Sequence, residues 1–429
     1  MKHVVIVGGG FAGMSCANKL LHYSKDIHIT LIDKNNYNQF KPLLYQVATS
    51  ALSTDDVACV FRDFFKGKPN IDIKMSEVIS ADPKTCSVKT KEGDIYQGDY
   101  LVLAAGAAVN FFNTLGAEQS AFPLYTLNDA ERLRSRILSV FEEADRNPAL
   151  IDQGALNFVI VGAGPTGTEV AGALADMFQQ ILPSEYQDLM IKKSQIYLVD
   201  HSHVVLGAFS NNSQEYAAKI LQQRGVKLNL GLLVKEVATD HVLLSNGNKI
   251  STHTVIWAGG LKAVPLAGFC GLSQGHGDRI NVTGDLTAEN FPNVFILGDL
   301  ANIDGSDGKP LPQLASVAQQ CGRWTAQNIA ADLEGKPRKP FHYHDKGIMA
   351  MIGKNAAIAE IGPKRHQFEG TFAFAAWLGV HAALLFTFRQ KIEAFIEWAW
   401  DYFGNVRGQQ VLDRENASKI KWEETNVSK

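Results

Sequence analysis

Two stretches of the chain combine a short apolar strand with a glycine-rich turn, and this duplication limits the possible folds. The first is VVIVGGGFAG at residues 4–13, and the second is NFVIVGAGPTG at residues 157–167. In each, a continuous β-branched run predicts a buried parallel strand, and helical spacing follows the turn. Second strands follow at residues 27–33 and 194–200. The sequence therefore predicts an α/β chain that contains the same βαβ unit twice.

The first turn has the spacing of a dinucleotide-binding turn. Gly8, Gly10 and Gly13 fit G-x-G-x-x-G between a strand and a helix. In this pattern the first glycine permits the tight turn, the second lets a pyrophosphate approach the backbone, and the third lets helix and strand pack closely. Asp33 ends the next strand, where a carboxylate accepts hydrogen bonds from a ribose, and Lys34 follows it. We expect these residues to hold one dinucleotide.

The second turn repeats this arrangement. Gly162, Gly164 and Gly167 follow a strand, and Asp200 ends the partner strand. A carboxylate at that position repels a 2′-phosphate, so NADH is expected in preference to NADPH, although His201 beside it weakens this preference. Two such units in one chain predict two dinucleotides, and a flavin with a nicotinamide is the most economical pair because hydride passes readily between them.

The length of 429 residues predicts more than one domain. Strands at 100–106 and 254–260 end in small-residue turns that contain Gly106 and Gly259, which we expect beside the two cofactors. A later strand at 293–301 has no glycine-rich helix of its own kind after it, so we expect it to return to the first domain. The predicted boundaries are 1–112 with 275–335, then 113–274, and then 336–429.

Composition excludes several classes of function. The formal net charge of -3 gives no electrostatic case for binding nucleic acid. None of the five cysteines forms a C-x-x-C pair, so we expect neither a metal site nor a thioredoxin-like redox pair. The N-terminus reads directly into the first strand without a signal peptide, which predicts a location on the cytoplasmic side of the membrane.

The order of these segments resembles the flavoprotein oxidoreductases that have two dinucleotide-binding domains. Three longer strings, at 40–52, 343–361 and 376–403, resemble the type II NADH:quinone oxidoreductases, and the resemblance spans roughly residues 3–405. It implies two Rossmann-like domains with a C-terminal membrane-docking extension. FAD would lie in the first domain and NADH in the second. Hydride would pass from nicotinamide to flavin, and two electrons would then pass to a membrane quinone without ion pumping.

The resemblance also implies roles for individual residues. Gly298-Asp299 matches the motif whose aspartate contacts the FAD ribityl chain. Glu169, on the first turn of the second helix, matches a glutamate near the nicotinamide and quinone sites, whereas the alternative is simple complementation of the helix dipole. The quinone pattern Ala-Gln-x-Ala-x-Gln is matched by Gln319, but Ala315 replaces its first glutamine. This departure leaves open a soluble NAD(P)H-dependent reductase with another acceptor, and a low-turnover flavin redox sensor is a further alternative.

The C-terminal region contains a nearly uncharged run at 371–388, followed by an amphipathic aromatic segment at 389–403. Membrane-surface attachment, core or dimer packing, and a spanning helix are all compatible with this pattern. The amphipathic spacing and the resemblance favour a peripheral position on the membrane surface. A homodimer remains possible.

Overall fold

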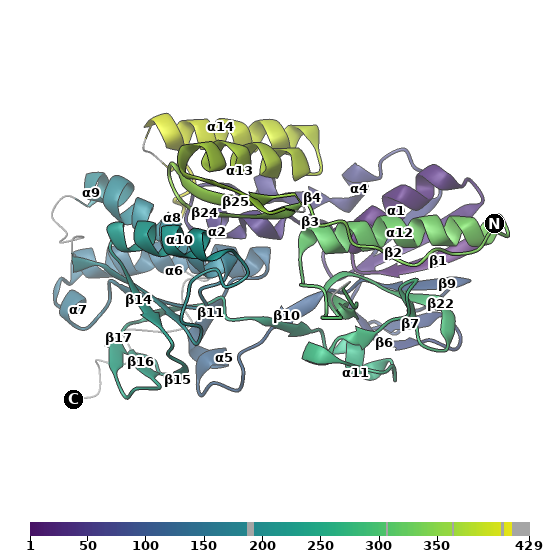
Figure 1. Ribbon diagram of the computed structural model, residues 1–429, viewed down its shortest axis with the longest axis horizontal. Coiled ribbons are helices and arrows are strands. Elements are labelled where there is room, and N and C mark those ends of the chain that lie inside the picture. Colours follow the sequence, from purple (N-terminus) through teal and green to yellow (C-terminus); the bar gives the residue numbers. More distant parts are fainter. Residues whose placement is uncertain (187–192, 306–307, 363, 405–406, 414–429) are drawn as a thin grey trace. The chain divides into compact units, whose positions relative to one another are not determined.

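The computed structural model describes residues 1–186, 193–305, 308–362, 364–404 and 407–413 (Figure 1). The chain forms two compact units. The first comprises Met1–Gln39, Ala58–Val109 and Leu261–His344, and the second comprises Phe40–Val57, Asn110–Gly260 and Asp345–Lys429. This grouping differs from the expected boundaries, because 40–57, 110–112 and 345–429 join the second unit while 261–274 and 336–344 join the first. The assignment of a ligand to each domain stays a prediction.

A six-stranded sheet with the order β21-β22-β9-β1-β2-β5 forms the centre of the first unit. Its strands are β1 (Lys2–Val7), β2 (Ile27–Asp33), β5 (Ile71–Met75), β9 (Tyr100–Leu103), β21 (Thr287–Ala288) and β22 (Phe291–Ile296). β1 pairs in parallel with β2 and β9, and β22 pairs in parallel with β9. The last pairing confirms that the strand near residue 293 returns to the sheet of the first βαβ unit.

Two helices, α1 (Phe11–Tyr23) and α12 (Ala315–Leu333), run side by side along this sheet (Figure 1). Gly322 permits their close approach, since a Cβ there would lie 2.2 Å from the Ala12 carbonyl oxygen and 2.9 Å from the Cys16 nitrogen. The smaller elements of this unit are β3 (Tyr37–Gln39), β4 (Ala58–Val60), α4 (Phe61–Phe64), β6 (Val78–Asp82), β7 (Ser87–Thr90), β8 (Ile95–Gln97), β10 (Ala107–Val109), β19 (Leu261–Ala263), α11 (Leu266–Phe269), β20 (Ile280–Asn281) and β23 (Ala301–Asn302).

Gly322→Ala is expected to destabilise the protein by about 2–4 kcal/mol, because the new methyl group overlaps main-chain atoms that cannot rotate away. The melting temperature, measured by tryptophan fluorescence, should fall by several degrees. Gly268→Ala is the matched control, since nothing lies within 4 Å of its added Cβ. Equal melting temperatures for the two variants would contradict the close packing of α1 and α12.

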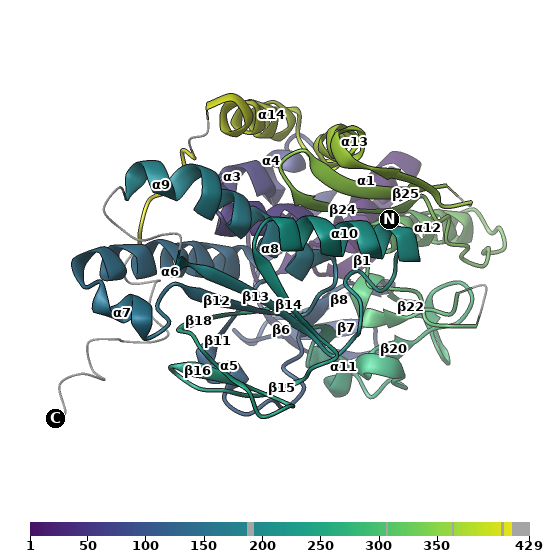
Figure 2. The ribbon, with the colours of Figure 1, turned by 60° about the vertical axis from the view of Figure 1, so that its left-hand side comes forward.

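The second unit has a parallel sheet with the order β11-β18-β12-β13-β14. Its strands are β11 (Ala121–Pro123), β12 (Asn157–Val161), β13 (Gln195–Asp200), β14 (Val226–Leu230) and β18 (Thr254–Trp257), and its main helices are α6 (Leu127–Arg146), α8 (Pro165–Asp176) and α10 (Asn211–Gln223). The helices lie along one face, and the antiparallel sheet of β15 (Val234–Val237), β16 (His241–Leu244) and β17 (Lys249–Ser251) lies beyond the other (Figure 2). Each unit therefore contains its own β-turn-α-β element, as the duplicated turns predict.

The C-terminal segment adds the antiparallel strands β24 (Gly347–Gly353), β25 (Ala356–Ile361) and β26 (His366–Glu369), and then α13 (Gly370–Leu384) and α14 (Phe388–Gly404). β24 packs against α8 at Gly172, where a Cβ would lie 2.1 Å from the Ile352 carbonyl oxygen. The same unit contains α2 (Leu44–Ala48), α3 (Thr54–Val57), α5 (Ala117–Ser120), α7 (Ala149–Asp152) and α9 (Leu182–Glu185). Within the part of the chain that the structure describes, no helix is long and apolar enough to cross a bilayer.

Candidate active site

The first glycine turn contains one glycine that the chain's own packing does not explain. Gly8 has φ +99°, and a Cβ there would lie 2.4 Å from the Ala104 carbonyl oxygen. A Cβ on Gly13 would lie 1.9 Å from the Gly8 carbonyl oxygen. Gly10, in contrast, has φ -70° at the N-cap of α1 and nothing within 4 Å of an added Cβ. The open space above Gly10 fits the close approach of a dinucleotide pyrophosphate at a helix N-terminus.

Asp33 is fixed beside this turn. One of its carboxylate oxygens accepts from the Gly9 N–H at 2.7 Å and the other from the Asn35 N–H at 2.8 Å. Asn38 donates to the Gly9 carbonyl at 2.6 Å, while its own buried Oδ1 has no hydrogen-bond partner among the described residues. A buried acceptor of this kind needs a donor from elsewhere, such as a ligand hydroxyl. The exposed Lys34 follows directly.

Gly298 and Asp299 lie at the same end of the first unit's sheet, in a short turn after β22. A Cβ on Gly298 would lie 3.3 Å from the Cβ atoms of both Ala12 and Ala318, so this turn meets the N-terminal ends of α1 and α12. Gly106, with φ +76°, follows β9 at this edge. Ala315 is the first residue of α12. The structure thus brings together the residues that the sequence predicts for the first cofactor.

The start of α12 also supports a second alignment of the glutamine pattern, one residue later than the predicted one. In that alignment Ala315 and Ala318 match both alanines, Gln320 matches the second glutamine, and Ser316 replaces the first. Ser316 Oγ lies 2.9 Å from the Tyr343 hydroxyl, and Gln320 exchanges hydrogen bonds with the His344 main chain. Gln319, which directly precedes Gln320 on α12, is half-buried. Its contact with flavin or quinone stays a prediction.

The second glycine turn has the same geometry as the first. Gly162 has φ +105°, and a Cβ there would lie 2.5 Å from the Ala258 carbonyl oxygen. A Cβ on Gly167 would lie 1.8 Å from the Gly162 carbonyl oxygen. Gly164, the N-cap of α8, has φ -71° and nothing within 4 Å of an added Cβ. The middle glycine again leaves space that the protein does not fill.

Asp200 repeats the hydrogen bonds of Asp33. Its Oδ2 accepts from the Ala163 N–H at 2.6 Å and its Oδ1 accepts from the Ser202 N–H at 2.7 Å. His201 Nδ1 lies 3.1 Å from the same Oδ1. Gly259 follows the neighbouring strand β18. Both units therefore combine an open middle glycine with a carboxylate at the end of the second strand.

Glu169 occupies a different position from the predicted one. α8 begins at Pro165, so Glu169 is its fifth residue, and no acidic residue lies in the first turn. The prediction that it lies on the first turn is therefore wrong, and its carboxyl group is poorly placed to complement the helix dipole, which acts within that turn. The side chain is buried instead, and it accepts from the Met351 N–H at 3.3 Å.

The groups that contact the Glu169 carboxyl directly are uncharged. Burial raises the pKa of Glu169 to about 8, although the N–H groups of Met351 and Trp377 oppose this shift. The His381 ring stacks on Trp377 with 3.7 Å between ring centres, and burial lowers the pKa of His381 to about 4, so this imidazole is neutral at pH 7. Burial also raises the pKa of Tyr45 well above its usual value. Glu169 is accordingly protonated at neutral pH and is suited to proton donation.

Sequence reasoning missed Tyr45, Met351 and Trp377 as neighbours of Glu169, and it missed His381, which stacks on Trp377. They come from α2, β24 and α13, which are far apart in the chain. The available signal was that all four lie in the three strings that resemble the quinone oxidoreductases, at 40–52, 343–361 and 376–403.

Glu169→Gln is expected to change the pH dependence of stability. Between pH 4.5 and 8 the folded protein keeps a proton on Glu169 that the unfolded chain releases, so native stability falls through this window by about 1.4 kcal/mol per pH unit at most. The amide does not titrate, so the stability of the variant relative to the native protein should rise from pH 5 to pH 8. Melting temperatures across this range provide the measurement. The exposed Glu215→Gln is the control, and parallel curves for all three proteins would contradict the buried acid.

Comparison with known proteins assigns this arrangement to a family. Residues 2–322 match the pyridine nucleotide-disulphide oxidoreductase family model. The type II NADH:quinone oxidoreductase Ndh of Mycobacterium tuberculosis is 33% identical over 429 residues, which cover 96% of this chain and 91% of that protein. The chain belongs to the type II NADH:quinone oxidoreductase family. The Haemophilus influenzae member is 27% identical and covers 89% of this chain and 93% of its own.

Solved structures agree on the fold. The structure of NDH2 from Plasmodium falciparum in complex with NADH has a TM-score of 0.86, 19% identity, and coverage of 98% of this chain and 100% of that one. The sulfide:quinone oxidoreductase of Aquifex aeolicus has a TM-score of 0.72 and 20% identity. All five cysteines of the present chain are buried, and none is in a disulfide.

Proposed function

We propose that the protein is a FAD-dependent enzyme that transfers two electrons from NADH to a membrane quinone without ion pumping. The observation that carries the proposal is the pair of equivalent turns, in which Gly10 and Gly164 leave open space beside Asp33 and Asp200. FAD is assigned to the first unit and NADH to the second. Family membership supports the choice of donor and acceptor.

The overall reaction fixes what the protein's residues must supply. NADH, one proton and quinone give NAD⁺ and quinol, so the hydride accounts for two electrons and one hydrogen, and the second hydrogen comes from solvent or a side chain. The first turn and Asp33 would hold the flavin, which when bound would supply the hydride acceptor and the electron carrier. Glu169 is the buried acid that holds a proton at neutral pH, and we assign it the role of proton donor. Asp200 orients the ribose and favours NADH over NADPH.

A soluble reductase with another acceptor is the second candidate. The start of α12 favours this candidate because it departs from the family's glutamine pattern. In the alignment that begins at Ala315, Ser316 replaces the first glutamine, and its hydroxyl is already hydrogen-bonded to the Tyr343 hydroxyl. A low-turnover redox sensor would bind the same two cofactors, but it would not cycle rapidly with any quinone.

Anaerobic absorbance spectroscopy tests the proposal and separates these candidates. Under the proposal, the purified protein absorbs as an oxidised flavin, NADH bleaches it, and a short-chain quinone then restores the absorbance rapidly. Bleaching by NADH without recovery on adding quinone would favour the other acceptor. Slow bleaching would favour the sensor, and a folded protein that takes up no FAD would reject the whole assignment.

Membrane-surface attachment through α13 and α14 is part of the proposal. The two helices expose large apolar side chains, including Phe372, Phe388, Trp400 and Phe403, which are between 64% and 82% exposed. An exposed apolar face of this kind marks a membrane or protein contact. A lipid-soluble acceptor is most accessible to an enzyme that lies on the bilayer surface.

Phe388→Ser combined with Trp400→Ser is expected to lower binding to phospholipid vesicles by about tenfold or more, since each side chain contributes roughly 1.5–3 kcal/mol when buried. Co-sedimentation with vesicles is the measurement. Ile95→Ser combined with Leu233→Ser is the control, because these side chains are 70% and 60% exposed on other elements. Unchanged co-sedimentation together with a change from dimer to monomer would identify the face as a subunit interface instead.

A further inference from the structure

The second unit contains a cavity of about 330 Å³ beneath the two C-terminal helices. Its walls come from α2, α8, the β24–β25 hairpin, α13, α14 and the side chain of Arg407. The volume lies at the small end of the range of about 300–1,000 Å³ that is typical of small-molecule sites. The cavity therefore has room for one small molecule and not for a two-chain lipid.

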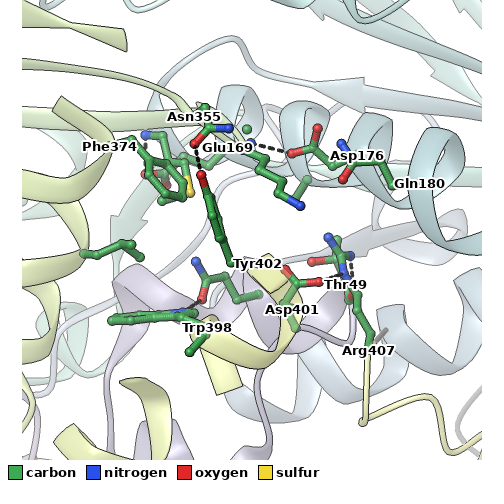
Figure 3. A pocket seen from close by; sticks show the side chains of 18 of the residues that line it. Thr49, Glu169, Asp176, Gln180, Asn355, Phe374, Trp398, Asp401, Tyr402 and Arg407 are labelled. Atoms are coloured by element: carbon green, nitrogen blue, oxygen red, sulfur yellow. Dashed lines mark hydrogen bonds and ion pairs between the residues drawn. The ribbon is translucent and has the colours of Figure 1, made fainter. Parts of the chain in front are cut away.

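The cavity has an aromatic side and a charged side (Figure 3). Phe374 and Trp398 lie at one side, and Asp176, Asp401 and Arg407 lie at the other. The aromatic side is held by hydrogen bonds, since Trp398 Nε1 donates to Gln46 Oε1 at 2.7 Å and Gln46 donates to the Tyr45 hydroxyl at 3.0 Å. These bonds fix an apolar wall next to polar groups, which is the arrangement that suits an amphipathic ligand.

Arg407 is a buried cation that forms a long ion pair with Asp401 and lacks a full set of hydrogen bonds. It is 7% exposed, and its Nη1 donates to the Thr49 carbonyl at 2.5 Å. Its Nε has no hydrogen-bond partner among the described residues, because Asp401 Oδ1 lies 3.5 Å away. Burying a guanidinium with so few hydrogen bonds costs free energy unless a further acceptor binds its remaining N–H groups. A carboxylate suits this role because its two oxygens can accept two parallel hydrogen bonds from a guanidinium.

Charged groups of both signs surround the cavity. The lining carries Lys354 and Arg407 as cations and Asp176 and Asp401 as anions, while the buried Glu169 is protonated at neutral pH. Asp176 forms an ion pair with Arg224, which lies just behind the wall. Glu185 is a third carboxylate that acts on Arg407, so three cations face three anions, and the case for an anion rests on the Nε of Arg407.

We propose that this cavity is a binding site for a single-chain carboxylate, an acyl chain that places its carboxylate on Arg407 and its tail between Phe374 and Trp398. The ligand reaches the site from the exposed apolar face, because Phe395 and Phe403 line the cavity while they are 65% and 82% exposed. The cavity adjoins the proposed electron-transfer site, because Glu169, the proposed proton donor, lines it. Its occupancy can nevertheless be measured on the resting protein, without turnover.

Isothermal titration of the full chain in one non-ionic detergent tests the site with decanoate and with decanol. Decanoate is expected to bind at least about tenfold more tightly than decanol, and Arg407→Gln should remove this difference. Arg389→Gln on the outer face of α14 is the matched control, because its side chain is 77% exposed, and it should bind decanoate normally. Ala399→Leu fills part of the cavity without removing a polar group, and it should weaken decanoate at least about tenfold even if Arg407→Gln fails to fold.

Two results would overturn the proposal. Equal affinities for decanoate and decanol would mean that the cavity does not recognise an anion. One-for-one displacement of decanoate by a short-chain quinone would mean that the cavity belongs to the quinone path. Turnover with NADH and quinone is a separate readout, so a native protein that turns over normally but does not bind decanoate rejects this site without affecting the proposed function.

Discussion

Glu169→Gln is expected to lower kcat for quinone reduction by about 10²–10⁴-fold, the range that general acid catalysis usually contributes. The amide keeps the size of the side chain but cannot give up a proton. The native enzyme should lose activity as the pH rises through about 8, where Glu169 ionises, and the variant should show a flat profile there. Steady-state NADH oxidation with a short-chain quinone between pH 6 and 9 measures both effects.

Glu360→Gln is the matched control for this experiment. Glu360 is also a buried glutamate of the second unit, but it accepts from the Ser210 N–H and the Ser213 hydroxyl, so its role is to fix β25 against α10. This variant should lose stability and keep its kcat and its pH profile. A Glu169→Gln enzyme with normal flavin content and a kcat within about threefold of the native value would exclude proton donation by Glu169.

The sequence predicted the parts of the site that depend on local geometry. Gly8 is required for its φ of +99°, and Gly13 is required because a Cβ there would lie 1.9 Å from the Gly8 carbonyl oxygen. Such glycines can be recognised from their spacing in the sequence, and so can a carboxylate at the end of a strand. For this reason both turns, Asp33 and Asp200 were recognised without any structure. The return of the strand near residue 293 was also predictable, because that strand lacks a glycine-rich helix of its own.

The environment of Glu169 could not be predicted in the same way. Its pKa depends on α2, β24 and α13, which meet only after the chain has folded, and periodicity carries no information on such contacts. The first-turn assignment was wrong for a local reason, because Pro165 starts the helix four residues before Glu169. The grouping of residues 40–57 with the second unit likewise depends on long-range packing of α2 against α6 and α8.

Gly10→Ala is expected to weaken FAD binding by about 10- to 100-fold, while Gly164→Ala raises the KM for NADH by a similar factor and leaves the flavin in place. Both glycines have φ near -70° and nothing within 4 Å of an added Cβ, so alanine fits the folded chain at either position. The methyl group acts only on a ligand that approaches the backbone, and it displaces the pyrophosphate from the helix N–H groups.

The pair of variants tests the assignment of the two cofactors to the two turns, because each serves as the control for the other. Retained flavin per chain after gel filtration, titration of the apoprotein with FAD, and KM for NADH are the measurements. Exchange of the two phenotypes would reverse the assignment of FAD and NADH. Normal flavin content and normal KM in both variants would mean that neither turn contacts a pyrophosphate. Gly13→Ala cannot make this distinction, since its Cβ overlaps the Gly8 carbonyl and would disturb the fold before any ligand binds.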